Sequence, residues 1–456
     1  MAEVTTAQRI RPLEKIGYGL GDTASNVVFQ MVMMYLAFFY TDVFGISAAA
    51  MGTLFLVVRV IDAVTDPLMG ALADRTTTRW GKFRPYLLWL ALPYGLIAVI
   101  AFITPDFSPE GKLIYAYITY ALLMIIYTAI NIPYAALGGV ITGDSQERVS
   151  LNSYRFFLAT AAGVLVASAT LPLVDWLGGG NQQKGFPLAM AVLSVLAVIM
   201  FVACFALTKE RVVEATAKAT TFWKDLKVLL TNDQFVIVAI LNFALLIPLV
   251  IRGASAIYYI TWYVGEETLI PAFLTAGMLA SMVGAAFASP LTKRVSKVRS
   301  YMLIQIVVTV VSAAMFFLSS SAVVLIFAFF IVVQFFAQMG SPILWGMMAD
   351  TVEYGELKTE RRITGLVFSG ALFSLKLGMA LGGALLGWLL AWFGYQSEAV
   401  SQTPEAINGI VLLFTVIPAF GHLLLVGIVT RYKLSKERCE EIRAELDRRH
   451  ALEASA

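Results

Sequence analysis

The chain has 456 residues, of which 59% are hydrophobic and only 14% are Asp, Glu, Lys or Arg. Because ordinary soluble domains contain about 25% charged residues, this composition excludes a soluble globular protein and indicates a polytopic membrane protein. The formal net charge is +3; it arises from basic loops and indicates neither a nucleic-acid nor an acidic partner.

Apolar runs long enough to cross a bilayer, about 20 residues each, follow one another along the chain with polar or Pro/Gly breaks between them. We predict an all-α integral membrane protein with twelve transmembrane helices. They lie near residues 16–41, 48–73, 84–104, 112–140, 152–176, 187–208, 233–263, 269–291, 300–318, 322–349, 364–393 and 405–430. Only Ser319–Ser321 separates the tenth run from the ninth.

Lysine and arginine residues in the connecting segments predict the orientation, because cytoplasmic loops are enriched in them. When the segments are assigned alternately to two sides, one side receives the basic loops after spans two, six, eight and ten and the basic tail. The other side keeps only Lys112 and Lys184. We therefore expect both termini to be cytoplasmic.

The longest polar interruption, at residues 209–232, divides the spans into two sets of six. We predict an N-terminal half at 1–208, a linker at 209–232, a C-terminal half at 233–431 and a tail at 432–456. The loops after spans two and eight begin with Leu72-Ala73-Asp74-Arg75 and Leu291-Thr292-Lys293-Arg294, which indicates an internal repeat. Two six-helix halves related by an axis along the membrane normal are the plan of the major facilitator fold.

Span two carries Arg59, Asp62 and Asp66 at spacings that place all three side chains on one helix face. A carboxylate at the bilayer centre costs about 2.5–3.5 kcal/mol on insertion scales, so this face must meet protein or water. Two adjacent carboxylates repel unless a proton or cation lies between them. A structural ion pair with Arg59 would balance only one acid, so the stripe predicts a coupling-ion site. Span eight, the counterpart in the other half, has no acid, which assigns the ion to the N-terminal half.

Four further polar residues interrupt other spans: Asp22, Asn131, Arg155 and Lys376. Buried ions need partners, so we expect Asp22 to pair with Arg155 and Lys376 with an acid of span two. Carboxylate, amide and guanidinium groups can bond the adjacent hydroxyls of a sugar. These residues are the predicted substrate site.

Several motifs resemble the glycoside-pentoside-hexuronide:cation symporters, a family that includes melibiose permease. They are Gly17-Tyr18-Gly19-Leu20-Gly21-Asp22, Tyr40-Thr41-Asp42-Val43-Phe44-Gly45, Arg59 to Gly70, Arg79-Trp80-Gly81-Lys82-Phe83-Arg84-Pro85, Asn131-Ile132-Pro133-Tyr134, Arg155-Phe156-Phe157 and Asp350 to Glu356. The resemblance extends over essentially the whole chain and is nearest to the alpha-xyloside carriers of bacterial inner membranes. It implies a multi-pass inner-membrane location.

The resemblance implies roles for individual residues. Asp22, Asn131 and Arg155 would bind the glycoside, Asp62, Asp66 and Thr128 would hold the cation, and Lys376 would lie near both. Asn131 replaces an acid of melibiose permease, which disfavours a galactoside. Thr65 replaces the asparagine of sodium-using members, so an amide ligand for a hard cation is missing. The Thr65 hydroxyl can still coordinate a cation, and Thr65 is included among the predicted cation ligands. The coupling ion is therefore predicted to be H⁺ rather than Na⁺, with Asp62 and Asp66 as metal ligands only if it is Na⁺; no other cofactor is expected.

Charged residues of the cytoplasmic loops are candidates for a gating network. Opposite charges stand after span two and between spans ten and eleven, and such pairs could latch one conformation; positive-inside topology explains the basic ones equally well. The predicted set is Arg59, Asp74, Arg75, Arg84, Asp350, Glu353 and Arg362. Among the aromatic residues, Trp345 is the candidate for stacking on a sugar.

An enzyme is not expected, because the chain has no nucleotide-binding loop and no metal-spaced His/Cys cluster. The predicted function is import of a sugar or glycoside together with a monovalent cation, by alternating access in a monomer surrounded by membrane lipid. Two alternatives stay open: a cation-coupled lysolipid transporter, and a facilitator or sensor with the same fold.

Overall fold

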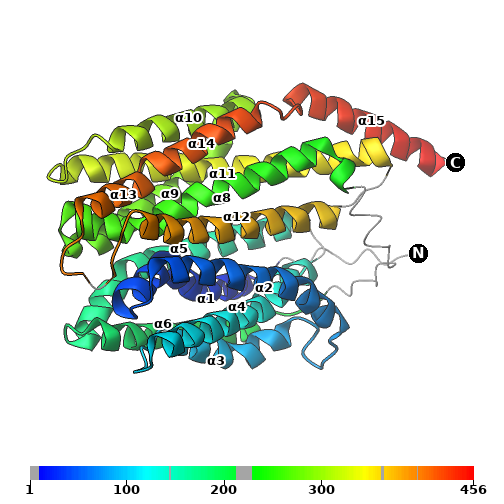
Figure 1. Cartoon of the computed structure of the whole chain (residues 1–456). Helices are drawn as coiled ribbons and strands as arrows, with labels where there is room; N and C mark the ends of the chain where they lie inside the picture. The colour runs from blue at the N-terminus through cyan, green and yellow to red at the C-terminus, as the bar shows by residue number, and fades with distance from the viewer. Residues whose placement is uncertain (1–9, 143–144, 212–228, 361–363, 398, 456) are drawn as a thin grey trace. The chain divides into compact units, whose positions relative to one another are not determined.

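The computed structural model describes residues 10–142, 145–211, 229–360, 364–397 and 399–455 and most of their side chains (Figure 1). In this part of the chain every element is helical, apart from an isolated bridge between Thr78 and Gly81. The first elements are α1 (Pro12–Phe38), η1 (Phe39–Val43), α2 (Ala48–Arg75), α3 (Arg84–Ala101), α4 (Pro109–Val140), α5 (Ser145–Gly178) and α6 (Gln182–Leu207). The later ones are α8 (Asp233–Tyr258), η2 (Tyr259–Val264), η3 (Glu267–Leu269), α9 (Ile270–Arg294), α10 (Lys297–Met315), α11 (Val323–Thr359), α12 (Thr364–Trp392), α13 (Pro404–Phe414), α14 (Val416–Val429) and α15 (Lys436–Ser455).

The chain forms two compact units. One comprises Met1–Ala217 with Gln396–Val400, and the other comprises Lys218–Tyr395 with Ser401–Ala456. The division falls within the predicted linker at 209–232, of which residues 212–228 lie outside the described part. Each of the two units is compact by itself.

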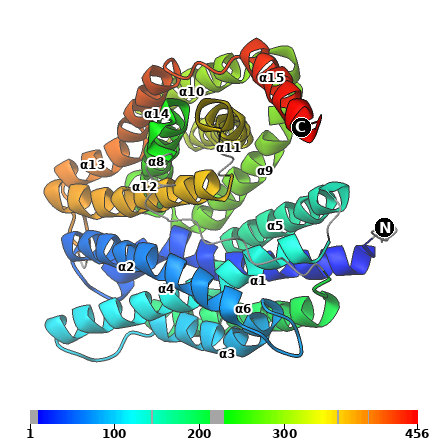
Figure 2. The same ribbon diagram turned by 90° about the vertical axis from the view of Figure 1, so that its right-hand side faces the viewer.

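Both units use the same scheme of helix pairing. In the first, α1 packs on α5 and α6, α2 packs on α4, and α3 packs on α4 and α6. In the second, α8 packs on α12 and α14, α9 packs on α11, and α10 packs on α11 and α14. When α13 and α14 are counted as one span, each pairing in the first unit has a counterpart in the second unit between spans at the same positions in the order. Figure 2 shows α11 end-on, with its partners α8, α9 and α10 around it. The internal repeat indicated by the loop motifs is therefore present in the packing.

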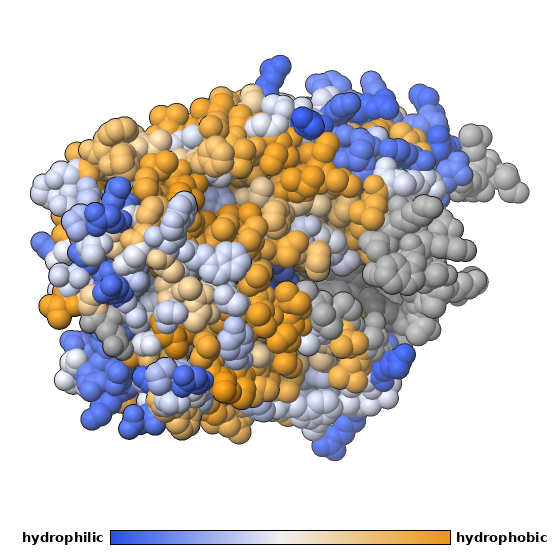
Figure 3. All heavy atoms as spheres, in the orientation of Figure 1, coloured by the Kyte–Doolittle hydropathy of each residue, from blue (hydrophilic) through white to orange (hydrophobic). Residues whose placement is uncertain are grey.

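Eleven helical segments of the described chain are long and apolar enough to cross a membrane. Helix α2 is not one of them; its 28 residues span about 42 Å and carry the predicted charged stripe. Together with α2, the eleven segments of the described chain make twelve, the number of transmembrane helices that we predict from the sequence. The face drawn in Figure 3 is mainly apolar along the helices, and hydrophilic residues gather toward their ends.

The tenth predicted span ends ten residues too early. The apolar run stops near residue 349, but α11 continues to Thr359 and ends where Glu360 adopts a left-handed conformation with φ 56°. Asp350, Glu353 and Glu356 were expected in a loop, and they lie instead on this helix. Asp350 and Glu356 are buried there and Glu353 is half-buried, and Asp350 pairs with Lys297 of α10.

A break divides the last span between α13 and α14, and Arg252 of α8 stabilises it. Pro418 has no N–H, so the carbonyl of Phe414, four residues earlier, loses its helical partner. The Arg252 guanidinium, only 2% exposed, donates from Nε to the Phe414 carbonyl at 3.2 Å. Its Nη2 donates to Ser312 Oγ of α10 at 2.6 Å. One buried side chain thus connects three helices at the break.

The C-terminal tail is an ordered part of the second unit. Tyr432 donates its hydroxyl to the Met347 carbonyl at 2.9 Å, and the backbone N–H of Lys433 donates to Gln234 Oε1 at 2.7 Å. Helix α15 then packs on α11 with Ile442 and Leu446 buried. The predicted tail therefore packs on the C-terminal unit through α11.

We predict that Gly185→Ala destabilises the protein. A Cβ atom at this position would lie 2.2 Å from the Val174 carbonyl oxygen, where α5 and α6 approach closely. Overpacking of this kind costs about 1–3 kcal/mol, which should lower the midpoint of thermal unfolding in detergent. Gly427→Ala is the matched control, because no atom lies within 4 Å of the added Cβ. Equal midpoints for the two variants would contradict the close approach.

Candidate functional site

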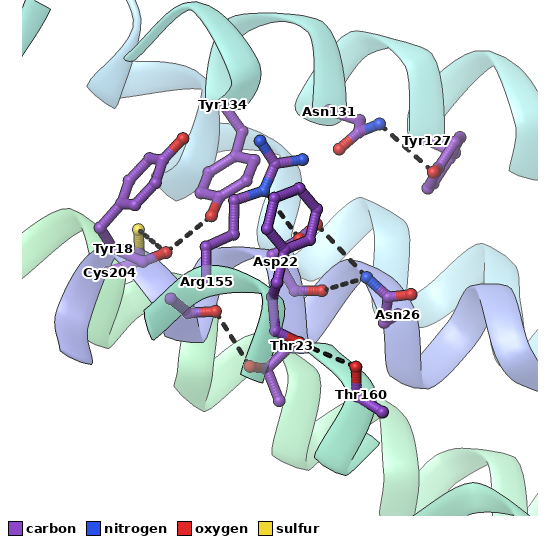
Figure 4. A network of polar contacts seen from close by, with 12 residues as sticks. Tyr18, Asp22, Thr23, Asn26, Tyr127, Asn131, Tyr134, Arg155, Thr160 and Cys204 are labelled. Atoms are coloured by element: carbon purple, nitrogen blue, oxygen red, sulfur yellow. Dashed lines mark hydrogen bonds and ion pairs between the residues drawn. The ribbon is translucent and has the colours of Figure 1, made fainter. Parts of the chain in front are cut away.

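An ion pair joins α1 to α5 inside the N-terminal unit (Figure 4). Arg155 Nε lies 2.8 Å from Asp22 Oδ2, and Asp22 is only 6% exposed. Asn26, one turn further along α1, donates its amide to the Asp22 carbonyl at 2.9 Å and to Asp22 Oδ1 at 3.3 Å. The pairing predicted from the sequence is therefore confirmed, and the buried carboxylate has the charged and polar partners that it needs.

Aromatic rings surround this ion pair. Tyr134 of α4 stacks on Tyr18 of α1 with ring centroids 4.9 Å apart, and its hydroxyl donates to the Tyr18 carbonyl at 2.8 Å. The Arg155 guanidinium lies 5.4 Å from the ring centroid of Tyr134 and 5.4 Å from that of Phe156. Both tyrosines are buried, whereas Phe156 is 63% exposed. The tyrosines can therefore position the pair, and Phe156 presents an open ring face next to the guanidinium.

Asn131 of α4, labelled in Figure 4, has a different partner. Its amide donates to the Tyr127 hydroxyl at 3.2 Å, one turn back on the same helix. Tyr127 in turn stacks on Phe29 of α1 with centroids 5.7 Å apart. Asn131 is half-buried, so part of its side chain is accessible.

The two acids of span two converge on one hydroxyl of α4. Thr128 Oγ1 lies 2.7 Å from Asp62 Oδ1 and 3.0 Å from Asp66 Oδ1. A hydroxyl has a single proton and can donate it to only one of two carboxylates at a time. Three oxygen atoms from two helices thus come together in a geometry in which a proton or a hard cation would relieve the repulsion.

Arg59 balances part of the negative charge. Its Nη1 lies 3.3 Å from Asp62 Oδ2, and both side chains are buried, at 5% and 0% exposure. Asp66 is more accessible than Asp62. Arg59, Asp62 and Asp66 together carry one net negative charge, which is the charge that one monovalent cation or one proton neutralises.

Thr65, a predicted cation ligand, has its hydroxyl on the helix backbone. It donates to the Asp62 carbonyl at 3.1 Å, which is the usual local bond of a threonine in a helix. Among the described groups of His, Cys, Asp and Glu, no set of three is arranged to hold a metal ion. The acids and Thr128 bring three oxygen atoms together in a small site.

Two residues of the predicted gating network make their contacts inside their own unit. Arg84 Nη2 donates to the Phe205 carbonyl at 2.6 Å. Asp350, 3% exposed, pairs with Lys297 at 2.6 Å and accepts from the Tyr432 hydroxyl at 3.4 Å. Arg75 is exposed and Glu353 is half-buried, while Arg362 and the side chain of Asp74 lie outside the described part.

The substrate residues predicted in the C-terminal unit lie on neighbouring helices. Trp345 of α11 is 39% exposed and stacks on Phe368 of α12 with centroids 6.1 Å apart. Lys376 is a half-buried residue of α12. Trp345 therefore has one face covered by Phe368.

Sequence reasoning missed the residues that support the ion pair and the amide: Tyr18, Asn26, Tyr127, Tyr134 and Phe156. Their spacing carried a signal, because Asn26 is four residues after Asp22, and Tyr127 and Asn131 are four apart. The contact between Tyr18 and Tyr134 joins two distant segments, so it could not be found from spacing alone.

A family profile described as "MFS/sugar transport protein" matches residues 17–436. The chain belongs to this family of major facilitator membrane transporters and, within it, to the glycoside-pentoside-hexuronide:cation symporters. It is 48% identical to the inner membrane symporter YicJ of Escherichia coli K12, over 92% of this chain and 91% of that protein. It is 36% identical to the isoprimeverose transporter of Lactiplantibacillus pentosus, over 96% and 92% of the two chains. Its identity to the glucuronide carrier protein homolog of E. coli K12 is 31%, over 95% of each.

Solved structures confirm the fold. A bacterial homolog of the human lysosomal transporter Spinster, in an inward-facing conformation, matches with a TM-score of 0.67 at 13% identity, over 93% of this chain and 99% of that one. The nucleoside transporter NupG matches with a TM-score of 0.60 at 12% identity, over 93% and 100% of the two chains. The family and its named relatives are membrane transporters, so the chain is a transporter and not an enzyme.

We predict that Thr128→Val weakens cation binding. The change keeps the shape of the side chain and removes the hydroxyl between Asp62 and Asp66; a hydrogen bond to a charged group contributes about 1.5–3 kcal/mol. The apparent cation affinity should therefore fall about tenfold or more. It can be measured from the rise in melting temperature of purified protein as Na⁺ is added or the pH is lowered. Thr128→Ser retains the hydroxyl and should behave like the wild type; loss of binding in both variants would contradict the bridging role.

Proposed function

We propose that this protein is a secondary active symporter that imports a neutral glycoside together with one monovalent cation. The observation that carries the proposal is the convergence of Asp62, Asp66 and Thr128 in the same six-helix unit as the Asp22–Arg155 pair. Relatives named as a symporter and as an isoprimeverose transporter support cation coupling and a sugar substrate. The basic loops support cytoplasmic termini in a bacterial inner membrane.

The cation part of the proposal rests on charge. Because Arg59 compensates one of two acids, a single bound H⁺ or Na⁺ makes the site neutral. We favour H⁺, since the Thr65 hydroxyl donates to a backbone carbonyl and the amide ligand of sodium-using members is absent. A proton needs only the two carboxylates and the bridging hydroxyl.

The sugar part rests on the groups around Arg155. The Asp22–Arg155 pair has no net charge and offers both donors and acceptors, which suits the adjacent hydroxyls of a neutral sugar ring. Phe156 supplies an exposed ring and Asn131 an amide. This polar pair favours a hydroxyl-rich ligand over a lysolipid tail. The contributions of Lys376 and Trp345 stay predictions from the sequence.

Helix α4 connects the two sites. Thr128 contacts the acids, Asn131 stands almost one turn further, and Tyr134 another turn on contacts Tyr18 and faces Arg155. When a cation removes the repulsion between Asp62 and Asp66, α2 can approach α4, and a shift of α4 changes the position of the sugar-binding groups. By linkage, sugar must then raise the affinity for the cation by the same factor as the cation raises the affinity for sugar.

The decisive test is transport into right-side-out vesicles. A panel of radiolabelled glycosides, including alpha-xylosides and hexuronides, is offered under an imposed pH gradient or sodium gradient. We expect one neutral glycoside to accumulate under one gradient, and Asp66→Asn to abolish accumulation. Asp175→Asn, an exposed acid near the end of α5, is the matched control and should transport normally. If no glycoside accumulates under either gradient, the proposal fails.

A second variant separates the sugar site from the cation site. Arg155→Lys keeps the positive charge, and a lysine has no planar guanidinium to bond Asp22 and face Tyr134 together. We expect the KM for the glycoside to rise at least about tenfold, while cation-induced thermal stabilisation stays at the wild-type level. A loss of cation stabilisation with an unchanged KM would place Arg155 in the cation site instead.

A further inference from the structure

A cavity of about 540 Å³ lies at the junction of two helix ends in the N-terminal unit, away from the Asp22 and Asp62 sites. The start of α1 and the end of α6 form its walls, and these helices pack on each other. The lining includes Arg11, Leu13, Glu14, Ala206, Lys209 and Arg211. Its size is within the range of about 300–1,000 Å³ that is typical of ligand pockets.

The polar wall of the cavity is built around Glu14. Arg211 forms a two-pronged ion pair with Glu14, with Nη1–Oε1 at 2.7 Å and Nη2–Oε2 at 2.8 Å. The backbone N–H of Lys209 donates to Glu14 Oε1 at 3.1 Å. The hydrogen bonds that Arg211 donates to Glu14 raise the pKa of the guanidinium above its usual value, so it is charged at any physiological pH. Arg211 also donates its backbone N–H to the Val140 carbonyl at 2.9 Å, which fixes this wall to the end of α4.

The lining carries a positive excess. The lining contains three cationic residues and one carboxylate, Glu14. Because Glu14 forms an ion pair with Arg211, the charges of Arg11 and Lys209 are in excess. The side chains of Arg11 and Lys209 are exposed at the rim. The cavity therefore attracts an anionic group, and it lies at the level where a membrane span ends and phospholipid headgroups begin.

The apolar wall continues into the surface that faces lipid. Along α6 the exposed residues recur at helical spacing, and they form one stripe: Leu188, Val192, Val195, Ile199, Val202 and Ala206. The last of them, Ala206, lines the cavity beside Leu13, which is 59% exposed. An acyl chain lying along this stripe would bring its headgroup directly to Arg11 and Lys209.

We propose that this cavity binds the headgroup of an anionic phospholipid, such as phosphatidylglycerol or cardiolipin, from the cytoplasmic leaflet. The phosphate lies between Arg11 and Lys209, and one acyl chain follows the α6 stripe. A free phosphate or sugar phosphate would use the same cations, but the apolar half of the cavity and its continuity with the stripe select a lipid. Basic pockets at the cytoplasmic ends of transmembrane helices suit such headgroups.

The test measures retention of phosphatidylglycerol by the purified full-length protein, using native mass spectrometry with phosphatidylcholine as the neutral competitor. Arg11→Gln combined with Lys209→Gln should reduce the apparent affinity for phosphatidylglycerol about tenfold. Lys184→Gln, which removes an exposed charge at the opposite end of α6, is the matched control and should leave retention unchanged. Arg11, Lys209 and Lys184 are all exposed, and melting temperatures verify that the variants are folded.

A second variant tests the apolar wall. Ala206→Glu places a carboxylate where the acyl chain enters and should also reduce retention. Equal retention by the wild type and the double variant would overturn the proposal. Displacement of the lipid by millimolar inorganic phosphate or glycerol phosphate would overturn it as well, and would assign the cavity to a soluble anion.

Discussion

A carboxylate with no exposed surface has to be balanced from inside the protein, and Asp62 is in this position. Its partners come from two helices: Arg59 from its own helix α2, and Thr128 from α4. The placement of α2 against α4 therefore depends on how the charges of Asp62 and Asp66 are compensated. In a region of low dielectric, a change of one charge alters this balance by far more than it would at a surface. In the proposed mechanism, a small ion at these acids thereby controls the position of a whole helix.

Helix α4 is the element through which that control can reach the substrate groups. Within two turns it contributes Thr128 to the acids, Asn131 to Tyr127, and Tyr134 to Tyr18. Pro133 lies between the last two, inside the helix, and removes one backbone hydrogen bond there. A helix with a missing internal bond bends more easily at that point. The two sites are thus joined by a helix that has a built-in place to flex.

Much of this arrangement could be predicted from the sequence, because the membrane restricts the choices. All described helices that span the membrane coincide with predicted apolar runs, since a lipid environment leaves a chain few alternatives to helix. The Asp22–Arg155 pair could be predicted because buried charges need partners. The end of α11 could not, because hydropathy reports the edge of the membrane and gives no information on where the helix stops.

Contacts between distant segments were the other limit. The stacking of Tyr18 on Tyr134, the attachment of Arg252 to Phe414 and the pairing of Asp350 with Lys297 all join residues of different helices. For these residues the sequence gives the helix face of each one, and several partners across the interface are equally possible. The predicted role of Asp350 in gating has to take account of the local partners that the structure assigns to it.

The ordered tail affects how the protein can be handled. Tyr432 donates to Met347 and Asp350, and α15 covers part of α11 with buried Ile442 and Leu446. Truncation before Tyr432 would uncover apolar surface of α11 and remove a hydrogen bond from a buried aspartate. A purification tag or fluorescent reporter should therefore be joined after the last residue of α15, so that the whole helix is kept.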